Sequence, residues 1–184
     1  MSFSNNSENA YHVVLGVNIA AGSGTVLDGF TISGAASGTA HITVGSKSIP
    51  QWYGGGMYNN TSSPGIKIRN SIIWGNTATI NGSNIYNAGS RKPDISCSIA
   101  EGSGGSDSWD PAAGNDGGGN LDADPVFAGT GDYRLGTGSP AINAGDNVCY
   151  APEEHPNLSA VTADLDGDSR IQGWRVDMGA YEKE

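Results

Sequence analysis

A short sequence pattern in this chain recurs at an interval of roughly 28 residues. This approximate repeat constrains the fold more than any other feature. The Tyr-Asn pair at Tyr58–Asn59 comes back at Tyr86–Asn87. The Ser-Ile pair at Ser71–Ile72 comes back at Ser98–Ile99 after almost the same interval. An earlier fragment at 25–35, TVLDGFTISGA, resembles the strand half of the same unit. A period of roughly 28 residues with short strands is typical of a solenoid.

The units contain short runs with alternating apolar character, such as IKIRNSIIW and DISCSIA, separated by Gly, Asn, Ser and Pro. Such short strands are stable only when equivalent strands of successive units pair in parallel, about 4.8 Å apart. Gly and Asn fit the corners because they adopt positive φ at little cost, and stacked Asn side chains can hydrogen-bond from coil to coil. We therefore expect an all-β chain that forms a parallel β-helix of about three to four coils.

A β-sandwich built from hairpins is the alternative architecture. Hairpins should show regular Asn-Gly or Asp-Gly turns between paired strands. Asn-Gly occurs once, at 81–82, and Asp-Gly at 28–29 lies inside a strand-like run. The pattern therefore favours the solenoid over the sandwich.

The composition changes after residue 104, where a stretch rich in Gly, Ser and Asp predicts a loop, followed by short strands and tight turns. We expect coils over residues 1–104 and a capping region over 105–184, packed on the last coil within one structural domain. Residues 1–100 carry a net charge near +2 and residues 101–184 one near −12. We therefore expect the capping region to be irregular and acidic. We expect no nucleic-acid partner, because binding of phosphates requires a basic face.

Neither export signal nor membrane span is expected within this chain. The start, MSFSNNSENAYHVV, has no basic region followed by an apolar stretch, so it does not read as a signal peptide. No apolar run is long enough to cross a bilayer, so no transmembrane segment is expected. Cys97 and Cys149 read as two small buried residues, and a disulfide between them stays open.

Three acidic residues in DLDGDSR form the candidate metal site. Asp164, Asp166 and Asp168 alternate along a turn, where their carboxylates can converge on a hard cation such as Ca²⁺. The EF-hand pattern fails, because a glycine falls at position four and an arginine at position twelve. The alternative is that these carboxylates bind turn amides and pair with Arg170 or Arg175. Calcium is the one cofactor considered.

Aromatic residues near the coils form one candidate ligand surface. Trp52 and Tyr53 can stack on sugar rings if they are exposed. Tyr58 and Tyr86 hold equivalent positions, so they should stack on each other in adjacent coils. The alternative to a sugar surface is an aromatic ladder inside the coils.

Basic residues on one strand form the second candidate surface. Lys67 and Arg69 alternate along the strand and therefore point to the same side, with Asp94 and Ser96 of the next coil nearby. The alternative is a solvated polar stripe. The chain has no nucleophile elbow, phosphate-binding loop or dinucleotide fingerprint, and we predict no catalytic residue.

The C-terminal sequence resembles that of a known protein family. NLDADPVFAGTGDYRLGTGSPAINAGDN, followed by DLDGDSRIQGWRVDMGAYE, is similar to the ending of bacterial secreted and surface right-handed parallel β-helix proteins, including choice-of-anchor proteins. The coils resemble, more loosely, repeats of polymorphic outer-membrane proteins. The resemblance covers roughly residues 9–182 and implies a right-handed helix and an exported location. It leaves the signal and the anchor outside this chain.

Two functional hypotheses follow. The first is a non-catalytic exported module for cell-surface adhesion, scaffolding or glycan contact, whose partner is a polysaccharide or a host or cell-surface glycan. The second is a fragment of a carbohydrate-active enzyme, either a polysaccharide lyase or a glycosidase. Two carboxylates facing each other across a cleft would favour the glycosidase.

Overall fold

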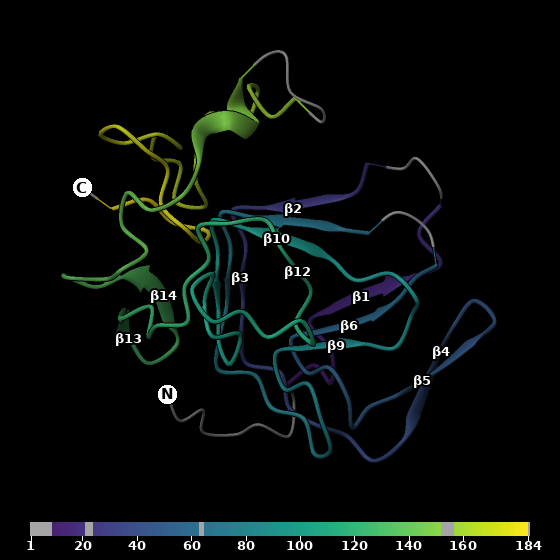
Figure 1. The fold of residues 1–184 in the computed structure, drawn as a ribbon. Helices are drawn as coiled ribbons and strands as arrows, with labels where there is room; N and C mark the ends of the chain where they lie inside the picture. Colours follow the sequence, from purple (N-terminus) through teal and green to yellow (C-terminus); the bar gives the residue numbers. More distant parts are fainter. Residues whose placement is uncertain (1–8, 21–23, 63–64, 152–156, 184) are drawn as a thin grey trace.

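The structure, a computed structural model, describes residues 9–20, 24–62, 65–151 and 157–183. This part of the chain is all-β, with short strands, one 3₁₀ turn, η2 (Asn147–Tyr150), and no α-helix. Most strands lie in parallel sheets, and two hairpins are antiparallel. Figure 1 shows the parallel sheets on the right of the molecule and most of the C-terminal region on the left.

The chain runs three times through the same three sheets, and each pass gives one strand to each sheet. The strands of the first pass are β1 (Val14–Val17), β2 (Val26–Asp28) and β3 (Thr31–Ile32); those of the second are β6 (Met57–Asn60), β7 (Lys67–Arg69) and β8 (Ile72–Ile73); those of the third are β9 (Ile85–Asn87), β10 (Asp94–Ser96) and β11 (Ile99–Ala100). The first sheet is β1-β6-β9, the second contains β2-β7-β10, and the third is β3-β8-β11.

The strand register places like residues opposite one another. Tyr58 pairs with Tyr86 in the first sheet, and Ile68 pairs with Ile95 in the second. The Tyr58 and Tyr86 rings lie 5.6 Å apart between centroids, so the predicted contact between these tyrosines is confirmed, but the rings are tilted by 34° rather than stacked. The repeat spacing read from the sequence is therefore also the spacing of paired positions.

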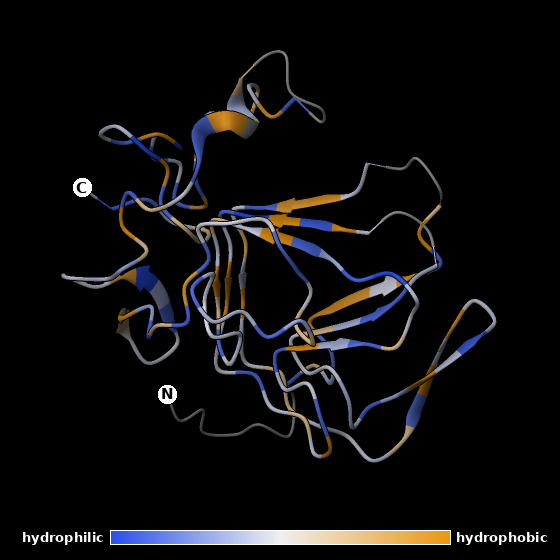
Figure 2. Cartoon of the chain, viewed as in Figure 1, coloured by the Kyte–Doolittle hydropathy of each residue, from blue (hydrophilic) through white to orange (hydrophobic). Residues whose placement is uncertain are grey.

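Alternation along each strand fills the space between the three sheets. On β7, Ile68 is fully buried, while Lys67 and Arg69 on either side of it are only partly buried. Ile68, Ile95, Ile73 and Met57 share one apolar cluster at 0% exposure. Burial of each such side chain contributes about 1.5–3 kcal/mol. Figure 2 shows these apolar stretches along the strands in orange.

A buried and a half-buried asparagine join one pass to the next. Asn59 is 0% exposed, and its Nδ2 donates to Oδ1 of Asn87 at 2.9 Å. Asn87 Nδ2 in turn donates to the carbonyls of Ala112 and Ala113. These bonds satisfy polar groups that would otherwise be costly inside the molecule. The coil-to-coil hydrogen bonding expected of stacked asparagines is thus present.

The fourth pass is shorter than the others. β12 (Asn115–Asp116) pairs with β10, and Leu121 forms a bridge with Ile99. The step along the chain from Asp94 to its partner Asn115 is shorter than the step from Lys67 to Asp94. Because the fourth pass is shorter, it provides no strand beside β9, and β9 is therefore an edge of the first sheet. The expected boundary at 104/105 stays a prediction, and β12 lies on its C-terminal side.

The excursion between the first two passes is an antiparallel hairpin. β4 (His41–Val44) pairs with β5 (Lys47–Pro50) across the two-residue turn Gly45–Ser46. Gly45 has φ of 60°, which suits the first central position of a hairpin turn. The hairpin extends away from the parallel sheets (Figure 1).

The C-terminal region begins with a second hairpin, β13 (Phe127–Gly129) and β14 (Asp132–Leu135). Leu135, Ala141 and Met178 pack with Ile72 and Ile99 in a second apolar cluster. The region therefore lies along the outer face of the third sheet. The sequence led us to expect it over the last coil, and it contacts the second pass as well as the third.

Candidate functional site

Two of the three carboxylates of the candidate calcium site, those of Asp164 and Asp166, have separate roles, and Asp168 is exposed. Asp164 Oδ1 accepts from the backbone N–H groups of Asp166 and Asp168, both at 2.9 Å. Asp164 Oδ2 accepts from the Glu182 N–H at 2.8 Å. Asp164 thus organises its own turn and holds the chain end, as the alternative interpretation expected of a turn carboxylate.

Asp166 forms an ion pair with an arginine that the sequence did not indicate. Its two oxygens accept from Nε and Nη2 of Arg134 on β14, at 2.6 and 2.8 Å. Across the described ranges, no group of three or more His, Cys, Asp or Glu side chains could hold a metal ion. Calcium therefore stays a sequence prediction without geometric support.

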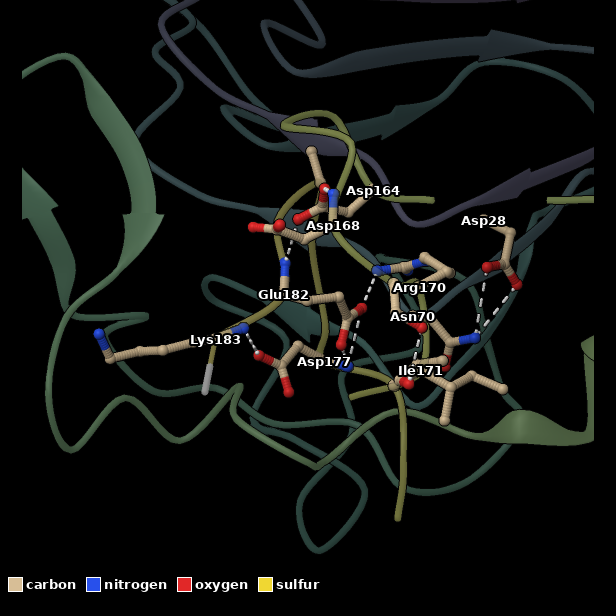
Figure 3. Close-up of polar contacts among 12 residues, drawn as sticks. Asp28, Asn70, Asp164, Asp168, Arg170, Ile171, Asp177, Glu182 and Lys183 are labelled. Atoms are coloured by element: carbon tan, nitrogen blue, oxygen red, sulfur yellow. Dashed lines mark hydrogen bonds and ion pairs between the residues drawn. The ribbon is translucent and has the colours of Figure 1, made fainter. Parts of the chain in front are cut away.

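Next to this turn, a buried polar network ties the C-terminal region to the parallel sheets (Figure 3). Arg170 and Glu182 form an ion pair with side-chain exposures of 5% and 0%. Arg170 Nε donates to the Tyr150 hydroxyl at 2.9 Å, and that hydroxyl donates to Asp28 on β2 at 2.8 Å. Asn70, at the end of β7, donates to the same Asp28 carboxylate. Strands of two passes are thereby linked to the chain end.

Burial dominates the electrostatics of this network. It raises the pKa of Glu182 to about 7, despite the opposing effects of the Asp177 N–H and of Arg170. It also raises the pKa of Asp177, whose carboxylate accepts from the N–H groups of Asn143 and Lys183. The carboxylates of Glu182 and Asp177 both have partners within the protein, so the network is a structural joint with a pH-sensitive member.

The two predicted ligand surfaces lie on different sheets. Lys67 and Arg69 face outward from β7 in the second sheet, opposite Asp94 and Ser96 of the next pass as expected. Trp52 and Tyr53 precede β6 of the first sheet. The structure therefore brings each pair together, but it does not join the two pairs into one site.

Trp52 and Tyr53 belong to a continuous strip of aromatic rings on the outer side of the first sheet. Tyr53 stacks on Tyr86 with centroids 4.4 Å apart and an angle of 17° between planes. Trp52 lies 6.4 Å from Tyr53 and packs edge-on against His41 of the hairpin. Trp52, Tyr53 and Tyr86 are all partly exposed. The aromatic strip, defined as His41, Trp52, Tyr53 and Tyr86, thus has accessible ring surface.

Tyr58 packs against the aromatic strip, and His12 packs against Tyr58. Tyr58 is 4% exposed and contacts Tyr86 and His12. Met57 and Ile85 of the same strands point into the core instead, so the tyrosines lie outside the coils. The internal aromatic ladder considered from the sequence is wrong in this respect, because strand alternation gives the inner positions to Met57 and Ile85. Burial and the neighbouring Tyr86 raise the pKa of Tyr58.

A cavity of about 500 Å³ lies beside β9, where the short fourth pass leaves the first sheet without a fourth strand. Its walls come from residues 76–85, from 100–102 and from 110–113. Glu101 and Asp110 both line it. Glu101 Oε2 accepts from the N–H of Gly75 at 2.7 Å and from Nδ2 of Asn84 at 3.0 Å.

A smaller cavity of about 220 Å³ adjoins the first. The two share Asn81, Gly82, Ile85 and Ala112 as wall residues. The smaller one is also lined by Tyr86, which connects it to the aromatic strip. We call the two cavities together the β9 groove. Sequence reasoning missed this groove; the shortened step from Asp94 to the next unit was the signal that could have indicated it.

Comparison with known proteins yields no relative: no family model, no curated protein and no solved structure matches this chain. Within the described ranges, no helix is both long and apolar enough to cross a membrane.

Proposed function

We propose that this chain is a non-catalytic exported module, built as a right-handed parallel β-helix, that contacts glycans at the cell surface. The three parallel sheets, each with one strand from each of the first three passes, support the β-helix. The resemblance of the C-terminal text to secreted and surface β-helix proteins supports export and the right-handed sense. Adhesion or scaffolding at a surface then requires an exposed contact face.

The aromatic strip beside the β9 groove is the observation that carries the glycan proposal. Stacked and partly exposed rings such as Tyr53 and Tyr86 offer flat apolar faces with a polar edge, which suit sugar rings. The groove next to them supplies amides and carboxylates for hydroxyl groups. Lys67 and Arg69 lie on another sheet and have no part in this proposal.

Binding to polysaccharides tests the proposal. Affinity electrophoresis on gels that contain cellulose derivatives, xylan, starch, glycogen or pectin should show retardation by at least one polymer. Tyr53→Ala should weaken that binding about tenfold, corresponding to roughly 1.4 kcal/mol of lost stacking. Tyr133→Ala is the matched control, since Tyr133 packs against Phe127 in the other hairpin, away from the strip.

Free migration of the wild-type chain in every gel would reject glycan contact. Equal retardation of Tyr53→Ala and the wild type would leave binding intact but remove the aromatic strip from the proposal.

A carbohydrate-active enzyme is the second candidate, favoured by one observation. Glu101 and Asp110 line the same cavity, and glycosidases use a pair of carboxylates about the scissile bond. Incubation with the same polymers, scored for new reducing ends and for unsaturated products, separates the candidates. Release by the wild type that is lost in Asp110→Asn would establish the enzyme, and absence of release on the whole panel would end this alternative.

A further inference from the structure

We propose that the β9 groove binds the end of an uncharged oligosaccharide chain, with the large cavity as the terminal subsite and Tyr86 as the exit platform. This inference rests on the glycan contact proposed above and names its ligand class. It begins from the place of the groove: the cavity lies beside the edge strand β9, between residues 76–85 and the segment 110–113 of the short fourth pass. A volume of about 500 Å³ is within the range of roughly 300–1,000 Å³ typical of small-molecule sites.

The walls of the large cavity offer both apolar and polar groups. Ile80, which is exposed, supplies apolar surface for the C–H face of a sugar ring. Asn81 accepts from the N–H of Gly82 through Oδ1 at 2.7 Å. In the described part of the chain, Asn81 Nδ2 has no protein acceptor, so it can donate to a hydroxyl oxygen of a ligand.

The polar floor of the cavity is already held in place. Asn84 is 9% exposed, and its Nδ2 donates to both the carbonyl and the carboxylate of Glu101. Its Oδ1 accepts from Nδ2 of Asn76 at 3.0 Å. The Glu101 carboxylate is therefore fixed by groups behind it. A fixed acceptor loses little side-chain freedom when a ligand binds.

The charges of the large cavity argue against an anionic ligand. Its described walls include the carboxylates of Glu101 and Asp110 but no Lys, Arg or His. A uronate or sulfated sugar would meet two like charges there. A hydroxyl group, in contrast, donates to a carboxylate in a charge-assisted hydrogen bond about twice as strong as a neutral one. The cavity thus matches an uncharged polyol.

The smaller cavity can hold the part of the oligosaccharide that extends out of the large cavity. It continues past Ala112 to Tyr86, whose ring stacks on Tyr53. Lys92, the cation that lines it, donates through Nζ to the carbonyl of Pro111 and so holds the 110–113 wall in place. A bound chain would then run from the terminal subsite onto the aromatic strip.

Calorimetric titration with soluble tetrasaccharides tests the inference. The probes are cellotetraose, xylotetraose, maltotetraose and N-acetylchitotetraose, with tetragalacturonate as the anionic probe. At least one uncharged probe should bind, and tetragalacturonate should bind at least tenfold more weakly. Ala112→Trp should reduce the affinity for the uncharged probe at least tenfold, because this exposed residue borders both cavities.

Ala128→Trp is the matched control, since Ala128 is an exposed alanine on β13 in the other hairpin. The substitution at Ala112 keeps the carbonyl that accepts from Asn87, so the wall itself is retained. Asp110→Asn should also weaken binding several-fold, while its side-chain oxygen can still accept from the Ala112 N–H as Oδ1 does now.

Three results would overturn the inference: no uncharged tetrasaccharide binds, tetragalacturonate binds as tightly as the uncharged probes, or the two tryptophan variants bind alike. Retention of long polysaccharides by the wild type in these cases would show that the aromatic strip alone contacts glycans. Loss of both kinds of binding would reject the proposed function together with the inference.

Discussion

The corner that follows β2, β7 and β10 requires a backbone conformation that few residues adopt. The residues there, Gly29, Asn70 and Cys97, have φ of 71°, 48° and 45°. Gly and Asn at such corners were expected from the sequence, because both tolerate positive φ. Cys97 was expected only as a small buried residue. It is a half-buried free thiol whose pKa is raised by burial, and the side chain of Cys149 lies outside the described residues.

Substitution of Cys97 measures the strain at this corner. Cys97→Gly should keep or raise the stability, since positive φ costs a non-glycine residue roughly 1–2 kcal/mol. Cys97→Val should lower the stability by at least about 1 kcal/mol, because a β-branched side chain tolerates positive φ least. Urea denaturation of both variants gives the difference. Equal stability of the two variants would contradict a left-handed corner at this position.

At the scale of elements, the joint between the C-terminal region and the parallel sheets depends on a few buried polar groups. Arg170 lies against Gly29 at a corner of the second sheet, where a Cβ would meet its guanidinium. Truncating one side chain of the buried Arg170–Glu182 pair leaves the other without one of its hydrogen-bond partners, which usually costs about 1–3 kcal/mol. The sequence predicted that the aspartates of the 164–168 turn pair with Arg170 or Arg175, but Asp166 pairs with Arg134 and Arg170 pairs with Glu182. Packing between irregular segments decides these partners, and periodicity does not describe it.

The raised pKa of Glu182 makes the stability of this joint depend on pH. Because the folded state holds the proton more tightly than the unfolded chain, the contribution of Glu182 is present below about pH 4.5 and is lost as the pH rises to about 7. The raised pKa of Asp177 acts in the same direction. Denaturation between pH 5 and 7.5 should therefore show stability that falls, on the order of 2 kcal/mol.

Two variants isolate this effect. Glu182→Gln should flatten the fall, although it also weakens the joint. Asp166→Asn, which alters the exposed pair with Arg134, should keep the wild-type slope over the same range. A slope that persists unchanged in Glu182→Gln, or stability that rises with pH in the wild type, would contradict the assignment to Glu182.

At the scale of the whole molecule, the sequence predicted what repeats and missed what breaks the pattern. Alternation and spacing indicated the parallel pairing and the opposition of Tyr58 and Tyr86, because these follow from local periodicity. The β9 groove arises from the length of the fourth pass, and the pair of Asp166 with Arg134 joins residues far apart in the chain. Both depend on packing between irregular segments, which periodicity does not describe.

The central claim is that successive passes lie on one another with like positions opposite. Oxidative cross-linking tests it most directly, in a background with Cys97→Gly and Cys149→Ser. Lys67→Cys with Asp94→Cys should form a disulfide readily, since these partners lie about 4.8 Å apart in parallel strands, within the range that a disulfide spans. Lys67→Cys with Ser96→Cys, at the far end of the same strand, should not. Equal cross-linking of the two pairs, or linkage of the second pair alone, would contradict the stacked arrangement.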